Sequence, residues 1–336
     1  MILALRALGV GDLATAVPAL RGLRAAFPAE PLALAAPRWL APLVDLIGGV
    51  DRLLPTDGLG PRAWPGRPPR LAVNLHGRGP QSHRLLAGAG ADRMLAFACP
   101  RAGYPDGPVW RSDEHEVARW CRMLAWYGVP CDPADLALRR PPGHHSAGLT
   151  IIHPGAKAPQ RRWPPERFAE VARELGAAGH RVVVTGSAGE RGLAADVAGL
   201  AGLPERAVLA GRTDMGELAG VVAGARLLIS GDTGIGHLAT AYGTPSVLLF
   251  GPVSPALWGP PPDRPQHVAL WHGQLRPGEP WPGELRPGEQ GGPAGSGVHP
   301  ALLAVTVAEV LAAAAAAQRA ATADGGRRAR QAVAAP

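Results

Sequence analysis

The sequence has few cysteines, few aromatic residues and few charged residues. Its three cysteines, Cys99, Cys121 and Cys131, show no C-x-x-C or C-x-x-H spacing. We therefore expect neither a disulfide framework nor a cysteine zinc site, and a reducing compartment fits the composition best. Only 5% of the 336 residues are aromatic and 18% are charged, whereas 46% are apolar. This balance excludes a disordered protein and leaves room for two ordinary α/β domains.

Long apolar runs of the kind that cross a membrane are also missing. The stretch 302–317 is mostly alanine and contains Glu309, so it predicts an amphipathic helix. The first residues carry Arg6 and Asp12 early and read as a first strand rather than a signal peptide. We therefore predict a cytoplasmic protein with no transmembrane segment, which leaves peripheral contact with a membrane open.

The net charge of +7 is mild, and part of it lies in an arginine-rich tail. Nucleic-acid binding would need a dense Lys/Arg patch with interleaved aromatic residues, which the sequence lacks. We therefore expect no nucleic-acid partner. A mildly basic body suits an anionic ligand or an acidic surface nearby.

The most informative stretch is 228–252, LISGDTGIGHLATAYGTPSVLLFGP. It predicts a buried strand, a glycine turn, a helix and a second buried strand over 246–250. Asp232, Thr233, Gly234 and Gly236 fall where the chain leaves the first strand, so helix N-terminal amides can approach an anion there, with His237 on the first turn. The alternative is a plain helix start, with Asp232 as N-cap and His237 as a surface histidine.

The whole chain alternates short apolar strands with helices, which predicts a doubly wound α/β fold. The proline-rich segment 128–146 indicates a linker. We predict an N-terminal domain over 1–145, a C-terminal domain over 146–318 and a disordered basic tail over 319–336. The segment 274–297 contains LRPGE twice and predicts a polar surface loop.

A glycine turn follows the first strand and invites two interpretations. Gly9, Gly11 and Ala14 match the spacing of a dinucleotide fingerprint, but the second strand ends in Ala35-Ala36-Pro37 without the acidic residue that would hold a ribose. An NAD enzyme is therefore disfavoured. Asp12 lies at a helix N-terminus, where the dipole favours an ionised base, or it serves as a simple N-cap.

Three ordered segments together resemble glycosyltransferase family 9, the heptosyltransferase-type enzymes. They are ILALRALGVGDLATAVPALRGLRAAFP, IIHPGAKAPQRRWPPERFAEVARELGAAGHRVVVTG and SGDTGIGHLATAYGTPSVLLFGP. The resemblance implies a GT-B fold, in which two Rossmann-like domains face each other across a cleft. It also implies a nucleotide-sugar donor such as ADP-heptose on the C-terminal domain, an acceptor on the N-terminal domain, and inverting transfer without a metal or other cofactor. The absence of a D-x-D triplet agrees with this.

The resemblance assigns roles to individual residues. Asp12 matches the catalytic base that deprotonates the acceptor hydroxyl. Asp232, Thr233, Gly234 and His237 match the donor-binding D-T-G-x-x-H motif. Arg161 stands where the family usually has a lysine that contacts the donor phosphates. The planar guanidinium of Arg161 should change the geometry of this contact, and Lys157 shares the role of binding phosphate. Glu190 matches a position that contacts the donor ribose in the family. An equally weighted alternative is that Glu190 is a solvated carboxylate at the start of a helix.

Two functions from different classes remain open. The first is a glycosyltransferase that passes heptose or another sugar to a glycan or a lipopolysaccharide-type acceptor. The second is a noncatalytic nucleotide-sugar binding protein on the same scaffold, because a fold does not determine activity. Asp12 favours the enzyme. A sugar diphosphate develops negative charge as it leaves, and the amides at 233–236 with Arg161 are suited to stabilise it.

Overall fold

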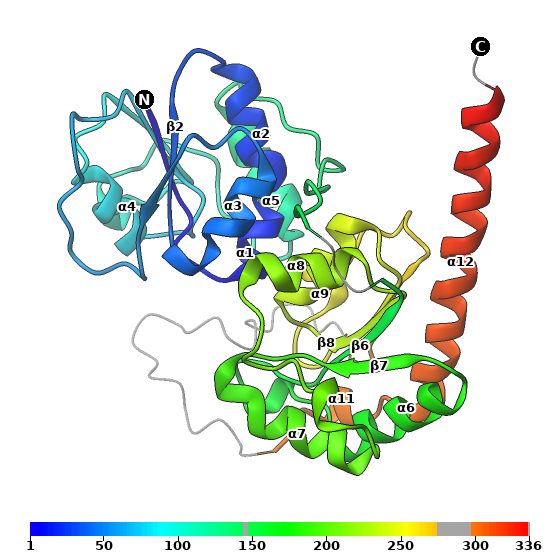
Figure 1. Ribbon diagram of the computed structural model, residues 1–336. Coiled ribbons are helices and arrows are strands. Elements are labelled where there is room, and N and C mark those ends of the chain that lie inside the picture. The colour runs from blue at the N-terminus through cyan, green and yellow to red at the C-terminus, as the bar shows by residue number, and fades with distance from the viewer. Residues whose placement is uncertain (144–146, 274–296, 335–336) are drawn as a thin grey trace. The chain divides into compact units, whose positions relative to one another are not determined.

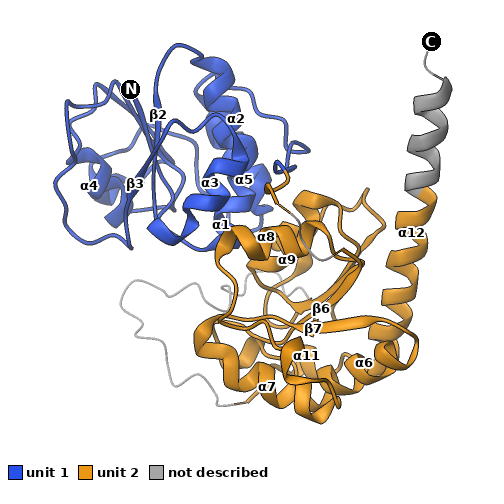
Figure 2. Cartoon of the chain, viewed as in Figure 1, with its two compact units in different colours: residues 1–139 blue, residues 140–336 orange. Residues whose placement is uncertain are grey.

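The computed structural model describes residues 1–143, 147–273 and 297–334. These residues form two compact units, 1–139 and 140–336 (Figure 2). The units part within the expected linker, between Arg139 and Arg140, a few residues before the predicted boundary at 145. Among the described residues, no helix combines the length and the apolar character that crossing a membrane requires.

Unit 1 is a five-stranded parallel sheet with helices around it (Figure 1). Its strands run in the order β3-β2-β1-β4-β5. The strands are β1 (Ile2–Leu5), β2 (Leu32–Ala36), β3 (Arg52–Pro55), β4 (Leu71–Asn74) and β5 (Arg93–Leu95). The helices and turns are α1 (Val10–Thr15), α2 (Val17–Ala26), η1 (Arg38–Leu40), α3 (Ala41–Ile47), α4 (Gln81–Ala87), η2 (Pro100–Ala102) and α5 (Glu116–Trp126). Every residue of β1, β2 and β4 is buried, as parallel strands covered on both faces require.

The single helix expected after β1 is divided in two. Pro18 lies in the first turn of α2, where its missing N–H and fixed φ are tolerated. Inside one continuous helix the same residue would remove a hydrogen bond and clash with the preceding turn. The chain therefore ends α1 at Thr15 and restarts at Val17.

Unit 2 repeats the architecture with the strand order β10-β9-β8-β6-β7. The strands are β6 (Leu149–His153), β7 (Arg181–Val184), β8 (Leu227–Gly231), β9 (Ser246–Leu249) and β10 (His267–Leu270). The helices and turns are η3 (Pro159–Arg161), α6 (Pro165–Ala177), η4 (Ala188–Glu190), α7 (Arg191–Leu200), η5 (Glu205–Ala207), α8 (Met215–Ala223), α9 (Gly234–Tyr242), α10 (Pro255–Trp258), α11 (Pro300–Leu303) and α12 (Val307–Ala334). Trp163 and Phe168 are fully buried in its core. Their rings pack edge to face, with 5.0 Å between the ring centroids.

The last helix extends further than the sequence analysis expects. In place of a disordered tail after residue 318, α12 continues to Ala334. Its run of alanines has the highest intrinsic helix propensity, and its first part packs against α6, β9 and β10. The LRPGE repeats lie outside the described residues. Edge strand β10 was not anticipated, because its four residues stand between proline-rich turns.

In both sheets the strand order reverses once. In unit 1 the reversal lies between β1 and β4, where Leu5 pairs with Asn74. In unit 2 it lies between β6 and β8, where His153 pairs with Ser230. In open parallel sheets, ligands bind in the crevice outside the carboxyl ends of the strands at such a reversal.

Two helical glycines test the packing of the fold. A Cβ on Gly22 of α2 would lie 2.6 Å from Cys131 Sγ and 2.7 Å from the Pro130 carbonyl oxygen, whereas one on Gly176 of α6 would meet nothing within 4 Å. We expect Gly22→Ala to destabilise the protein by about 1–3 kcal/mol through overpacking. Gly176→Ala should stabilise it by about 0.5–1 kcal/mol. Chemical unfolding of both variants checks this, and equal midpoints would contradict the packing of α2.

Candidate functional site

Unit 2 gathers most of the predicted site residues at the carboxyl edge of its sheet. Lys157 and Arg161 follow β6, Glu190 follows β7, and Asp232 to His237 follow β8. These three strands are neighbours in the order β8-β6-β7. The structure therefore places residues that are up to 80 positions apart in the sequence on adjoining loops of one edge.

Arg161 and Asp232 form an ion pair across the switch point. Arg161 Nη2 donates to the Asp232 carboxylate, and to the Asp232 main-chain oxygen at 2.9 Å. Asp232 is buried, whereas about a third of the Arg161 side chain is exposed. Both of these bonds use Nη2, and the buried Nε has no hydrogen-bond partner among the described residues. That unpaired N–H gives the guanidinium a second donor edge that an anion could satisfy.

The N-terminus of α9 lies beside this pair. Thr233 is the N-cap in an extended conformation, and its side chain does not cap the helix. The first amides of α9 are therefore suited to a ligand, apart from the Gly236 N–H, which donates to the Thr233 carbonyl oxygen at 3.0 Å. His237 is half-buried. Its ring packs edge to face against the ring of Trp258, with 6.0 Å between the ring centroids.

Gly236 does not have the environment that the sequence analysis expects. A Cβ at Gly236 would lie 2.8 Å from Leu248 Cδ2. The glycine therefore allows α9 to approach β9 closely, a packing role that glycines in this type of turn also have. A direct part for Gly236 in ligand binding stays a prediction.

Glu190 is bound into its own turn. Its Oε2 accepts hydrogen bonds of 2.8 Å from the backbone N–H and the hydroxyl of Ser187. Burial raises the pKa of Glu190, but the Ser187 hydrogen bonds and the nearby charge of Arg162 outweigh this effect and lower it. A Cβ at Gly155 would overlap the Glu190 carboxylate, so the β6 loop needs glycine there. Glu190 is thus ionised and held against the β6 loop, and it also acts as a helix-start residue.

Two other side chains of this edge differ in how well they are fixed. Lys157 is exposed in the β6 loop. His153, which the sequence analysis missed, ends β6 with its Nδ1 2.9 Å from Thr185 Oγ1. Burial lowers the pKa of His153, against the opposing charge of Glu190, so the ring is neutral near pH 7. An apolar strand pattern that ends in histidine was the available signal.

Unit 1 presents Asp12 at the carboxyl end of β1. Asp12 is the third residue of α1 rather than its N-cap, and its Oδ2 accepts the Gly9 N–H at 3.1 Å. The side chain is 29% exposed, so solvent or a ligand can reach it. The carboxylate is therefore fixed by the glycine turn and remains accessible.

Beneath Asp12 lies Arg6, which is only 1% exposed. Its Nη2 donates to Glu116 Oε1 at 2.8 Å and lies 3.4 Å from Asp12 Oδ1, and its Nε donates to the Asp12 carbonyl oxygen. Burial raises the pKa of Glu116, but the charges of Arg6 and Arg119 outweigh burial and lower it. Two carboxylates thus share one buried guanidinium, whose position fixes Asp12.

The pair formed by Arg6 and Glu116 is not among the contacts predicted from the sequence. An arginine inside the apolar run ILALRAL was a usable signal, because a buried charge needs a partner. The partner is 110 residues away, and no local pattern connects the two.

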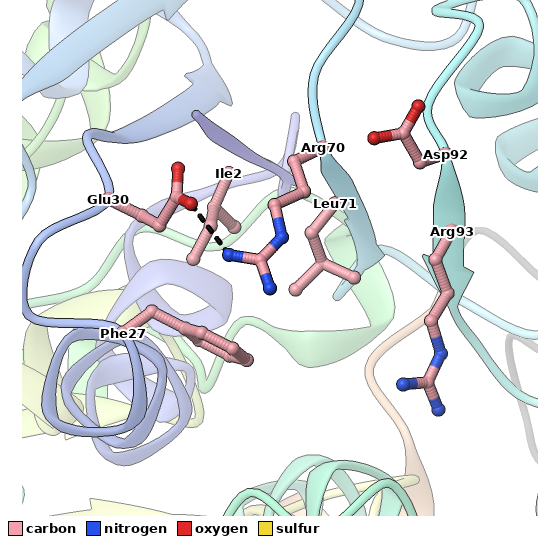
Figure 3. Close-up of a pocket in the computed structure, with 7 residues that line it drawn as sticks. All are labelled: Ile2, Phe27, Glu30, Arg70, Leu71, Asp92 and Arg93. Atoms are coloured by element: carbon pink, nitrogen blue, oxygen red, sulfur yellow. Dashed lines mark hydrogen bonds and ion pairs between the residues drawn. The ribbon is translucent and has the colours of Figure 1, made fainter.

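A separate cavity of about 180 Å³ opens at the other edge of this sheet (Figure 3). Ile2, Leu71 and Arg93 line it at the amino ends of β1, β4 and β5, so it lies away from Asp12. Arg70 reaches into it and pairs with Glu30 at 2.7 Å. The Arg70 charge is therefore already matched, and this cavity does not belong to the candidate site.

Across the described part of the chain, no group of three or more His, Cys, Asp or Glu side chains is arranged to hold a metal ion. The positive charge of the candidate site comes from Arg161, Lys157 and the α9 amides.

Comparison with known proteins agrees with this arrangement. Residues 129–277 match the family model of glycosyltransferase family 9 (heptosyltransferase). Lipopolysaccharide heptosyltransferase 1 of Pseudomonas aeruginosa is 35% identical over 186 residues, which cover 51% of this chain and 50% of that protein. The alignment thus spans about half the length of this relative.

Two solved structures share the fold. E. coli ADP-heptose lps heptosyltransferase II aligns with a TM-score of 0.71 at 20% identity, over 95% of this chain and 98% of that one. E. coli heptosyltransferase WaaC with ADP aligns with a TM-score of 0.62 at 19% identity, over 80% of this chain and 92% of that one. At this identity the likeness shows the fold alone. The predicted GT-B class, with two parallel-sheet α/β domains, is confirmed.

The Arg161–Asp232 pair makes a prediction about stability. Arg161→Met should destabilise the protein by about 1–3 kcal/mol, because it leaves the buried Asp232 carboxylate without its cation. Asp232→Asn in the same chain should recover part of that loss. A double-mutant cycle measured by chemical unfolding checks this coupling. Additive effects of the two substitutions would mean that the pair does not hold the loops together.

Proposed function

We infer that this chain, which belongs to glycosyltransferase family 9, transfers a sugar such as heptose from a nucleotide-sugar donor to a glycan or lipopolysaccharide-type acceptor. ADP-heptose is the donor we propose, since the E. coli relatives that share the fold are described as an ADP-heptose heptosyltransferase and as a heptosyltransferase with ADP. We propose an inverting, metal-independent reaction in the cytoplasm.

The observation that carries this proposal is the setting of Asp12. A protein that only binds nucleotide sugar needs no fixed, accessible carboxylate on its other unit. Here the Gly9 N–H and the buried Arg6 hold Asp12 at the carboxyl end of β1, beside the switch point of the sheet. This is the position at which an acceptor bound by unit 1 would present its hydroxyl.

The chemistry needs one proton transfer and one displacement. Asp12 takes the proton of the acceptor hydroxyl as its oxygen attacks C1 of the donor sugar. The bond between C1 and the diphosphate oxygen breaks, and its electron pair leaves with the nucleoside diphosphate. Attack opposite the leaving group inverts the configuration at C1, and no oxidation or hydride transfer takes part.

Unit 2 has groups suited to the leaving diphosphate. The amides of Thr233 and the first turn of α9 carry the positive end of the helix dipole. Arg161 adds a guanidinium whose Nε is unpaired, and Lys157 is exposed in the same loop. Fixed donors aimed at developing charge can take the place of a divalent cation. We propose that Glu190 contacts the donor ribose, and that Asp232 and His237 complete the donor site.

Activity and its independence of metal can be tested in one assay. Purified protein should release ADP from ADP-heptose when heptose-deficient lipopolysaccharide is present, because Arg161 and the α9 amides neutralise the leaving group. Excess EDTA should leave the rate unchanged. Loss of turnover that magnesium or manganese specifically restores would overturn the metal-free mechanism. Binding of ADP-heptose without any release of ADP would favour a binding protein.

Asp12→Asn tests the base directly. The amide can still accept the Gly9 N–H, but it cannot take a proton, so single-turnover rates should fall by roughly 10²- to 10⁴-fold. ADP affinity and the unfolding midpoint should change little. Asp45→Asn is the matched control, because Asp45 is exposed on α3 of the same unit. A normal rate in Asp12→Asn would end the assignment of the base.

A further inference from the structure

The loop that follows β4, residues 75–80, lies on the other side of the unit 1 switch point from Asp12. β4 is the neighbour of β1 on the side where the strand order reverses. Leu75 extends this pairing, because its N–H donates to the Leu5 carbonyl oxygen and its own carbonyl oxygen accepts Arg6 Nη1. The next residue, His76, is close enough to Arg6 for that charge to act on its ring. Asp12 and His76 thus lie near the same buried arginine.

A buried polar network holds this loop in place. Asn74, Ser82 and His83 are each at most 2% exposed. The Asn74 amide donates to Ser82 Oγ at 3.0 Å and to the Gly77 carbonyl oxygen at 3.2 Å, and its Oδ1 accepts the His76 N–H at 3.1 Å. The backbone of His76 is therefore fixed from below, independently of what its ring does.

The two histidines of this region differ in how their rings are bonded. His83 Nδ1 lies 3.0 Å from the Asn74 amide and its Nε2 lies 2.8 Å from the Phe97 carbonyl oxygen, so both nitrogens have partners. His76 Nδ1 is buried and has no hydrogen-bond partner among the described residues. An unpaired buried polar atom costs about 1–3 kcal/mol. A fixed loop that keeps such an atom unpaired beside the switch point of the sheet indicates a ligand group that pairs with it.

The charge state of His76 narrows the kind of ligand. Burial and the Arg6 charge lower the pKa of His76 to about 4, so the ring is neutral near pH 7. A neutral imidazole offers one donor and one acceptor, which match a hydroxyl group. A carboxylate or phosphate would instead pair best with a protonated, positively charged imidazole ring. The chemistry therefore favours a sugar hydroxyl.

We propose that His76 is an acceptor-binding residue, whose Nδ1 hydrogen-bonds a hydroxyl of the acceptor sugar and so orients the attacking hydroxyl toward Asp12. This inference rests on the proposed transfer function and adds the residue that selects and places the acceptor. His76 contacts the acceptor without exchanging a proton in the reaction.

Kinetics of His76→Ala test the inference, with heptose-deficient lipopolysaccharide as acceptor and ADP-heptose as donor. We expect the acceptor KM to rise about tenfold, as the loss of one hydrogen bond predicts. ADP affinity should stay unchanged, because His76 lies on the other unit from the groups proposed to bind the donor. The unfolding midpoint should stay level or rise, because the variant removes an unpaired buried atom.

Two variants separate binding from structure. His76→Asn places an amide near the position of Nδ1 and should restore the acceptor KM to within about threefold of the parent. His83→Ala should lower the unfolding midpoint, because it breaks a satisfied buried network. If His76→Ala lowered the midpoint as much as His83→Ala, with no specific rise in acceptor KM, His76 would be structural and the inference would be wrong.

The inference can fail separately from the proposed function. If the parent chain transfers sugar and His76→Ala keeps the parent acceptor KM, the function stands and the inference falls. If the parent shows no transfer, calorimetry with de-acylated, heptose-deficient lipopolysaccharide still tests His76. An affinity that His76→Ala leaves unchanged, or no binding by the parent, overturns the inference.

Discussion

The burial of Arg6 is the constraint on which the first unit depends. A guanidinium at the end of a central strand is removed from water, and only paired carboxylates and carbonyl oxygens make this tolerable. Glu116 on α5 is the carboxylate partner at 2.8 Å, and the Leu75 carbonyl oxygen accepts a further bond. Asp12 accepts through its carbonyl oxygen and, at longer range, its carboxylate. One charge thus ties β1, α1 and α5 together and fixes the residue that we propose as the base. The fold and the chemistry rely on the same contact.

The second unit uses a related arrangement with the charges at different depths. Asp232 is buried and Arg161 is the more exposed partner, so the accessible member of this pair is a cation rather than a carboxylate. In both units the pair lies beside the point where the strand order reverses. A carboxylate on one unit and a guanidinium with helix amides on the other are the two kinds of group that a displacement at a sugar diphosphate requires. We propose that this division lets two similar sheets serve different substrates.

Much of this could be predicted from the sequence where the signal is local. The β8 strand, the turn at Asp232 and helix α9 follow from a contiguous apolar, glycine and apolar pattern. The contacts of Arg6 with Glu116 could not, because they join residues 110 positions apart. The packing of Gly236 against Leu248 could not be predicted, because a glycine that admits a ligand and one that admits a neighbouring side chain look alike in a sequence. The helix over the tail was not predicted. The alanine content of this segment favours a helix, but its arginine-rich, polar end favoured the prediction of disorder.

The central claim is that Asp12 drives a single displacement, and the stereochemistry of the product tests it most directly. The anomeric configuration of the transferred heptose, measured by NMR on the freshly formed product, should be inverted relative to C1 of the ADP-heptose donor. One attack assisted by a base cannot give another result. Retention of configuration would contradict the account, because it would require a second displacement or a front-face reaction in which Asp12 has no role as the base.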